Sequence, residues 1–120
     1  MGILIKRIYE KPDPKDGTRI LVDRLWPRGL SKQKADIDVW LKTVAPSDAL
    51  RQWYGHDVKK WPEFKQRYFL ELDASAEAVE ALLGYVKQGD AALLYAAKDT
   101  EHNNAVALKE YMDGYGIERS

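Results

Sequence analysis

The chain of 120 residues contains no cysteine, and this absence excludes several chemistries together. Disulfide bonds, thiolate metal sites and catalytic thiols all require cysteine. Histidine is scarce as well, since the chain has two, His56 and His102, and their spacing fits no zinc-binding helix. We therefore expect no metal site. The lack of cysteine and of an apolar signal segment near the first residues leads us to expect a cytoplasmic protein.

Net charge is absent too, because 19 lysines and arginines balance 19 aspartates and glutamates. Proteins that bind nucleic acid or anionic membranes need a positive field, so we expect neither partner. No apolar run approaches the roughly 20 residues of a membrane span. A Walker loop is missing and the Rossmann fingerprint is incomplete, so we expect no bound cofactor.

The chain does contain an alternation of strand-like and helix-like segments. Apolar patterns predict strands over residues 3–9, 18–25, 37–41 and 91–96, and the last of these has the continuous apolar run of a buried parallel strand. Capping residues and helical spacing predict helices that begin near Ser47, Pro62, Ser75 and Asn104, with a short helical turn after Ser31. We predict an α/β fold in one domain over residues 1–120: a small layered sandwich whose mostly parallel sheet is flanked by helices.

The run from Val22 to Gly29 is the first candidate site, because it follows a predicted strand, where ligand crevices of α/β domains form. Arg24 and Arg28 could clamp a phosphate or carboxylate. Trp26 could stack on a ring, and Asp23 is a candidate acid–base group. The alternative is structural: a buried Arg24 would form an internal salt bridge with Asp23 or with another acid.

A second cluster lies between the predicted strand 91–96 and the start of the last helix. Free backbone N–H groups at a helix start bind anions, so we predict ligand-binding roles for His102, Asn103 and Asn104. Lys98 and Asp99 are candidate catalytic groups, and partial burial of Lys98 would make it a proton carrier or imine-former. Alternatively, an asparagine caps the helix and the rest is a solvated loop. If the strands are parallel, the two clusters face each other.

Several motifs resemble the YeaO-like bacterial family, domain of unknown function 488. The resemblance covers nearly the whole chain, and its first motif is distinctive. The matching residues are Val22–Gly29, Trp40–Lys42, Ala45–Ser47, Leu50-Arg51, Trp53, His56-Asp57, Phe64, Tyr68, Glu71-Leu72, Leu93–Asp99, Asn103 and Ala105.

The resemblance implies a small cytosolic single-domain α/β protein in a family without an established activity. Wider relatives carry a pattern like Leu-Leu-Cys-Ala-Glu-Lys-Asp and a later Cys-His-Arg. This chain has Tyr95 and Ala97 in the first pattern, and Asn103, Asn104 and Ala105 in the second. Thiol, metal or arginine chemistry proposed for those relatives is therefore not carried over, whereas the arginines of the first motif are.

Two functions follow as expectations. The first is a site, enzymatic or sensory, for a small anionic ligand such as a phosphate, a nucleotide or a carboxylate. An enzyme here would depend on acid–base and electrostatic catalysis, because no good nucleophile is present. The second is a non-catalytic interaction or dimerisation module, in which the tryptophans and the edge strand 36–40 form the contact surface. A monomer and a homodimer are both compatible with the sequence.

Overall fold

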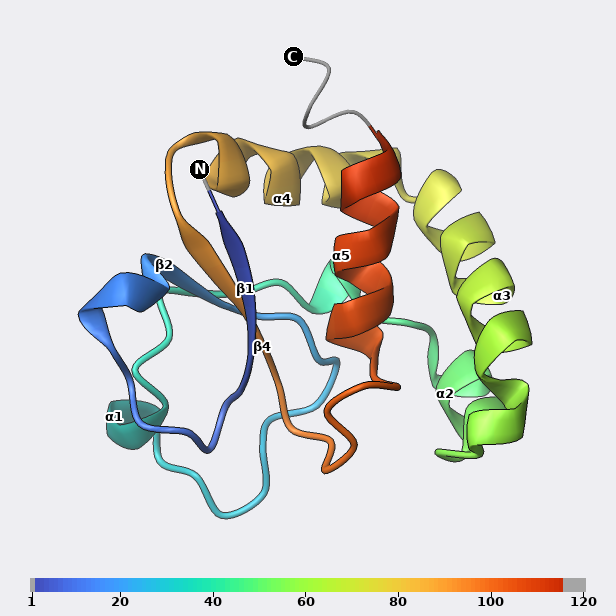
Figure 1. The fold of residues 1–120 in the computed structure, drawn as a ribbon, viewed down its shortest axis with the longest axis horizontal. Coiled ribbons are helices and arrows are strands. Elements are labelled where there is room, and N and C mark those ends of the chain that lie inside the picture. The colour runs from blue at the N-terminus through green and yellow to red at the C-terminus, as the bar shows by residue number, and fades with distance from the viewer. Residues whose placement is uncertain (1, 116–120) are drawn as a thin grey trace.

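A sheet of four parallel strands forms the centre of the molecule (Figure 1). The structure is a computed structural model that describes residues 2–115. The strands lie in the order β1-β4-β2-β3 and span Ile3–Arg7 (β1), Thr18–Leu21 (β2), Val39–Trp40 (β3) and Ala91–Tyr95 (β4). β4 pairs with both β1 and β2 and is buried at every residue, which confirms the predicted buried parallel strand.

The helices follow the predicted order along the described residues. They are α1 (Lys32–Ala35), α2 (Asp48–Tyr54), α3 (Trp61–Asp73), α4 (Ala76–Lys87) and α5 (Asn104–Tyr115), and 3-10 turns cover Pro14–Asp16, Lys42–Val44 and Val58–Lys60. The hydroxyl of Ser47 caps α2 by accepting from the Leu50 N–H at 3.1 Å, and Gly55 ends that helix in the left-handed conformation. Ser31 caps α1 as predicted, whereas Ser75 makes no side-chain cap bond at the start of α4.

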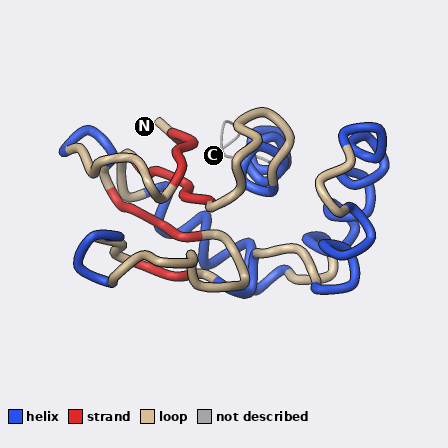
Figure 2. The backbone as a smooth tube through the Cα atoms, turned by 90° about the horizontal axis from the view of Figure 1, so that it is seen from below, coloured by secondary structure: helices blue, strands red, loops and turns tan. Residues whose placement is uncertain are grey.

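The two faces of the sheet are covered unequally. Residues paired across parallel strands share a face, and the register pairs Ile20 with Leu93 and Leu21 with Leu94. Ile20 and Leu93 face a large apolar core that includes residues of α2, α3, α4 and α5. Leu21 and Leu94 face a smaller core closed by α1 and by the loop that precedes it. The strands and the long helices therefore form adjacent layers, as Figure 2 shows, and the predicted α/β sandwich is confirmed.

A buried ion cluster fastens the smaller face. The Asp16 carboxylate accepts from Lys6 Nζ at 3.0 Å and from Arg19 Nη1 at 2.5 Å, and the Asp16 and Arg19 side chains are nearly inaccessible to solvent. Arg19 also donates to the backbone carbonyls of Ala35 and Asp36, each at 2.8 Å. The cluster thereby ties β1 and β2 to α1 and its C-terminal cap.

The end of β2 differs from the prediction, because the strand stops at Leu21 rather than at Leu25. The Val22 N–H still donates to Leu94 O at 3.1 Å, as the ladder requires. The next rung of a parallel ladder would join the Ala96 N–H to Val22 O. Instead, Asp23 Oδ2 accepts from the Ala96 N–H at 2.9 Å, and Asn104 Nδ2 donates to Val22 O at 3.0 Å. Side chains from the two predicted clusters thus replace the backbone rung.

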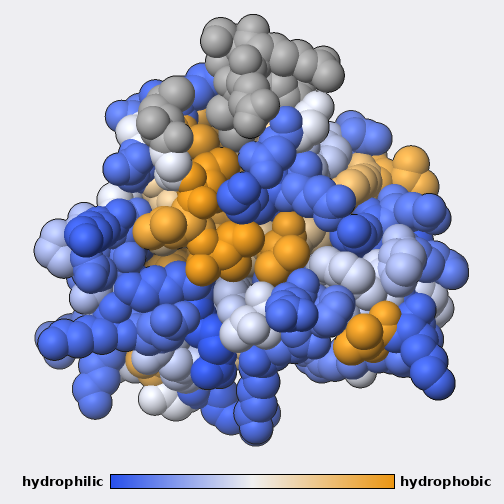
Figure 3. All heavy atoms as spheres, viewed as in Figure 1, coloured by the Kyte–Doolittle hydropathy of each residue, from blue (hydrophilic) through white to orange (hydrophobic). Residues whose placement is uncertain are grey.

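The surface is largely polar on the face seen in Figure 3, where apolar side chains also gather over β1 and α5. Leu4 of β1 is 46% exposed. No helix within the described residues is both long enough and apolar enough to cross a membrane.

Candidate functional site

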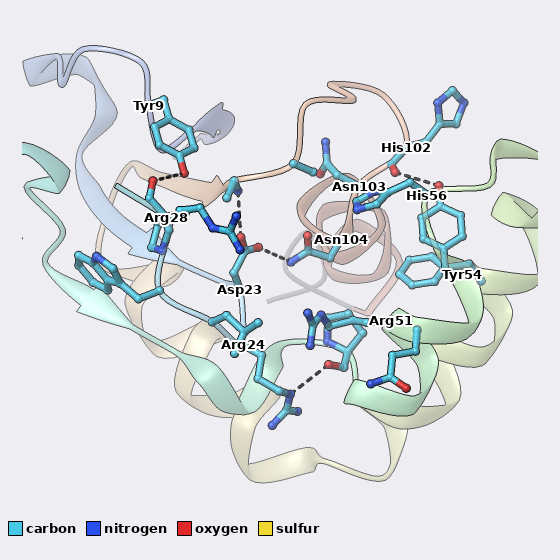
Figure 4. A pocket seen from close by; sticks show the side chains of 18 residues that line it. Tyr9, Asp23, Arg24, Arg28, Arg51, Tyr54, His56, His102, Asn103 and Asn104 are labelled. Carbon is cyan, nitrogen blue, oxygen red and sulfur yellow. Dashed lines mark hydrogen bonds between the residues drawn. The ribbon is translucent and has the colours of Figure 1, made fainter. Parts of the chain in front are cut away.

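A cavity of about 520 Å³ opens beyond the carboxyl ends of β2 and β4. Three separate segments supply most of its walls: the loop after β2, the C-terminal part of α2 with the residues that follow it, and the loop between β4 and α5 (Figure 4). The lining residues are Tyr9, Asp23–Arg28, Pro46, Arg51, Gln52, Tyr54, His56, Phe64, Ala96, Ala97 and His102–Asn104. The two clusters predicted from the sequence therefore meet at one cavity.

Cationic side chains outnumber acidic ones in the lining. Arg24, Arg28 and Arg51 contribute three guanidinium groups, whereas Asp23 is the one carboxylate among the lining residues. Both histidines of the chain also line the cavity. Asp48, outside the lining, offsets part of this excess by pairing with Arg24 and Arg51.

Arg24 is fixed by the turn that precedes α2. Its Nε donates to Pro46 O at 3.2 Å, its Nη2 donates to Ala45 O at 3.3 Å, and its Nε lies 3.9 Å from Asp48 Oδ1. Asp48 also accepts from Arg51 Nη1 at 2.6 Å. The acid near Arg24 is therefore Asp48, which fits the predicted alternative of a salt bridge with an acid other than Asp23, and backbone carbonyls accept its hydrogen bonds. The Nη1 of Arg24 bonds to no described residue.

Arg28 has a well-anchored backbone and an unengaged side chain. The Tyr9 hydroxyl donates to Arg28 O at 2.8 Å and holds the loop against the segment after β1. The guanidinium makes no hydrogen bond or ion pair with any residue from 2 to 115. In Figure 4 this side chain points into the cavity. A free guanidinium on an anchored backbone suits the bidentate binding of a phosphate or carboxylate.

Asp23 is a half-buried carboxylate at the floor of the cavity. Its Oδ2 accepts from the Ala96 N–H at 2.9 Å, and its Oδ1 accepts from Asn104 Nδ2 at 3.0 Å. Burial raises the pKa of the Asp23 carboxyl above its usual range, although these two hydrogen bonds and the charge of Arg51 oppose that shift. A cation or a hydrogen-bond donor that approached the ionised carboxylate from the cavity would therefore stabilise it.

The second cluster divides into residues that line the cavity and residues that shape the loop. Asn103 is buried, and its Oδ1 caps α5 by accepting from the Val106 N–H at 2.9 Å. Asp99 accepts from the backbone N–H groups of Glu101 and His102, at 2.9 and 3.0 Å, and from His102 Nδ1 at 3.0 Å. These hydrogen bonds lower the pKa of Asp99, and the bond from the Glu101 N–H has the largest effect. Asp99 is thus a loop-shaping residue outside the cavity lining.

Lys98 does not lie where its predicted role requires. The residue is exposed, and it is absent from the cavity lining. An exposed ammonium keeps its hydration, so the burial on which we based a catalytic role is missing. We leave both Lys98 and Asp99 out of the site.

The aromatic residues serve mainly as walls. Tyr54 and Phe64 are stacked, with ring centroids 4.4 Å apart, and are 5% and 2% exposed. The Trp26 indole donates to Leu30 O at 2.7 Å and meets Trp40 edge-on at 5.3 Å. Trp26 lines the cavity as predicted, while Trp40 is half-buried and donates to Asp23 O at 2.7 Å. Trp40, the tryptophan of the predicted contact strand 36–40, therefore makes its contacts within the chain.

Sequence reasoning missed the contribution of α2. Arg51 and Tyr54 are three residues apart on this helix, so they share a face, and both line the cavity. His56 follows with a positive φ of 60°, a conformation uncommon outside glycine, and lines the cavity too. Its neighbour Asp57 caps the next turn by accepting from the Lys59 N–H at 3.0 Å. The i, i+3 spacing was a readable signal, but the place where α2 docks was not.

Comparison with known proteins agrees with the resemblance seen in the sequence. Residues 2–117 match the family described as the inactive DUF488-N3 subclade. The uncharacterized protein YeaO of Escherichia coli K12 is 38% identical over 112 residues, which cover 93% of this chain and 97% of that protein. The uncharacterized proteins Rv3073c of Mycobacterium tuberculosis and Mb3100c of Mycobacterium bovis are each 37% identical, over 93% of this chain and 94% of theirs.

No solved structure matches the chain significantly. The family model spans almost the whole chain, and the curated relatives are matched along nearly their full length. The chain therefore belongs to the DUF488 family, within the subclade described as inactive.

Proposed function

We propose that this protein binds a small anionic ligand, bearing a phosphate or carboxylate group, in the cavity at the carboxyl edge of the sheet, and that it does so without catalysis. The observation that carries the proposal is the unengaged guanidinium of Arg28, which lines a cavity together with Arg24 and Arg51. The Tyr9 bond holds the backbone of this loop before the ligand arrives, and the exposed Arg28 side chain becomes ordered when the ligand binds.

The composition of the lining argues against nucleophilic catalysis. No serine, threonine, cysteine or lysine is among the lining residues. The positions at which the family resemblance leads us to expect a reactive thiol or carboxyl carry Tyr95 and Ala97 here. The matching subclade is itself described as inactive. A ligand-binding or sensory role agrees with all three observations.

The size of the cavity bears on the class of ligand. A volume of about 520 Å³ falls in the range of sites that enclose drug-sized molecules. An inorganic anion alone would leave most of that space to water. We therefore expect an organic phosphate or carboxylate to bind more tightly than the bare ion.

A thermal-shift screen with sugar phosphates, nucleotides and small carboxylates tests this proposal. A ligand at 100 times its Kd should stabilise the fold by about 2.7 kcal/mol, which gives a readily measured rise in Tm. We expect the rise to disappear in Arg28→Ala. Lys98→Ala is the matched control, because it removes one positive charge from a neighbouring loop outside the lining, and it should keep the rise. Equal losses in both variants, or no rise with any anion, would contradict the proposal.

A further inference from the structure

The cavity contains acceptor atoms that an anion-binding site does not need. Each oxygen of the Asp23 carboxylate accepts one hydrogen bond, Oδ2 from the Ala96 N–H and Oδ1 from Asn104 Nδ2. A carboxylate has about four lone-pair sites, so further donors can approach it from the cavity. For a purely anionic ligand, this half-buried negative charge would be a cost.

Asn104 adds a second acceptor beside it. Its side-chain amide lies between Val22 O and Asp23 Oδ1, at 3.0 Å from each. Both of these atoms only accept, so the amide atom that faces them must be the NH₂ group, and the orientation of the amide is fixed. The Oδ1 of Asn104 accepts no hydrogen bond from a residue between 2 and 115. In Figure 4 the nitrogen faces Asp23 and the oxygen is turned away from it.

The two kinds of group are close neighbours in the cavity. Figure 4 shows Asp23 between Arg28 on one side and Asn104 on the other. All three line the same cavity, together with Arg51, whose charge acts on Asp23. A ligand that fills this space meets guanidinium donors and uncommitted acceptors at the same time.

A metal ion is a poor occupant for the acceptor pair. No group of three or more acidic or histidine side chains suited to a metal occurs within the described residues. Nearby guanidinium groups would also repel a cation that carried no anion with it. A positive group covalently joined to an anion satisfies both halves of the cavity.

We propose that Asp23 and Asn104 form a subsite for an amino group, so that the ligand of this cavity is a small zwitterion whose phosphate or carboxylate is held by the arginines. This inference rests on the proposed function, since the arginines must bind the anionic end. The ammonium would donate to the Asp23 carboxylate and to Asn104 Oδ1, which gives three N–H donors at least two acceptors.

The test compares two probes that differ in the amino group alone. Phosphoethanolamine and propyl phosphate have the same length, and a methyl group in the second replaces the ammonium of the first. Titration calorimetry of the full chain with each probe gives two Kd values. We expect phosphoethanolamine to bind about tenfold more tightly or better, as a charge-assisted hydrogen bond predicts.

Two variants locate the preference. Asp23→Asn should reduce the preference for phosphoethanolamine to about twofold or less, and Asn104→Ala should reduce it in part. Propyl phosphate should bind Asp23→Asn at least as tightly as wild type, because a negative charge has been removed. The comparison in the wild-type chain needs no variant, so a variant that fails to fold does not block the test.

The outcomes separate this inference from the proposal beneath it. Equal Kd values for the two probes, with propyl phosphate binding lost in Arg28→Ala, would overturn the amino subsite and leave the anion site standing. A preference that persists in Asp23→Asn would also overturn the subsite. Binding of neither probe by the wild-type chain would overturn both.

Discussion

At the scale of single residues, the side chains of Asp23 and Asn104 both end strand β2 and line the cavity. They accept and donate where the β2–β4 ladder would have placed its next rung, and so end β2 four residues earlier than the apolar pattern predicts. The side-chain hydrogen bonds that replace this backbone rung lie at the wall of the cavity. A site built this way is part of the fold, because removing either side chain leaves a backbone group unpaired.

The buried carboxylate of Asp16 makes the sharpest prediction about stability. Its loss would leave Lys6 and Arg19 without their common partner, and breaking a buried pair in this way costs about 3–5 kcal/mol. Urea unfolding of Asp16→Ala should show a fall of that order in the free energy of unfolding. Glu80→Ala on the exposed face of α4 serves as the control and should stay within about 0.5 kcal/mol of wild type. A small effect in Asp16→Ala would contradict the cluster.

The pH dependence of Asp16 follows from the same contacts. Burial alone would raise the pKa of Asp16, but hydrogen bonds from Lys6, the Asp13 N–H and Arg19 outweigh burial and hold that pKa below its ordinary value of 3.8. A lowered folded-state pKa contributes stability that is complete above about pH 3.8 and is lost as the pH falls through the folded value. Acid titration should therefore show a smaller loss of stability below pH 3.8 in Asp16→Ala than in wild type, since other carboxylates such as Asp99 still titrate there.

At the scale of elements, α2 matters most, because it carries Arg51 and Tyr54 to the cavity. Ser47 fixes its start from two directions. Its hydroxyl accepts from the Leu50 N–H, and it donates to Glu71 Oε2 of α3 at 2.6 Å. The cap therefore also links α2 to α3.

Ser47→Ala should lower the free energy of unfolding by about 1 kcal/mol, the usual cost of losing a helix cap. Ser75→Ala is a matched control, since Ser75 stands at the start of α4 without a cap bond. Thermal or urea unfolding of the two variants checks the difference. Equal losses in both would show that the Ser47 hydroxyl contributes no cap.

The elements themselves were largely readable from the sequence, and their docking was not. Caps such as Ser47 and Gly55 act within a few residues, so local patterns predict them. The meeting of the two clusters also followed from the sequence, once the strands were taken to be parallel. The approach of α2 depends on distant contacts, such as the stacking of Tyr54 on Phe64, and no local pattern encodes them. We expected Lys98 to be partly buried because it follows a buried strand. The chain leaves the core directly after that strand, and Lys98 is exposed.

At the scale of the whole molecule, association through β3 has little to build on. This strand has two residues, and Trp40 is committed to Trp26 and to Asp23 O. The other outer strand of the sheet is β1, where Leu4 is 46% exposed. If copies of the chain associate, we expect the interface to use β1 rather than the strand 36–40.

The residues on which the proposed site depends, Asp23, Arg28 and Asn104, all come from one chain. We expect a monomer, with a sedimentation coefficient that does not change with protein concentration. A faster species that grows with concentration and disappears in Leu4→Lys would contradict this expectation and place an interface on β1.

The central claim is that an anion binds at the carboxyl edge of the sheet, and amide NMR during titration with propyl phosphate tests it most directly. We predict saturable shifts of the backbone amides of Asp23 to Trp26, Arg28, Ala96, Ala97 and Asn104, with little change at the opposite end of the strands around Gly17. The same titration of Arg28→Ala should leave these amides unmoved. Shifts centred elsewhere, or none at all in the wild-type chain, would contradict the account.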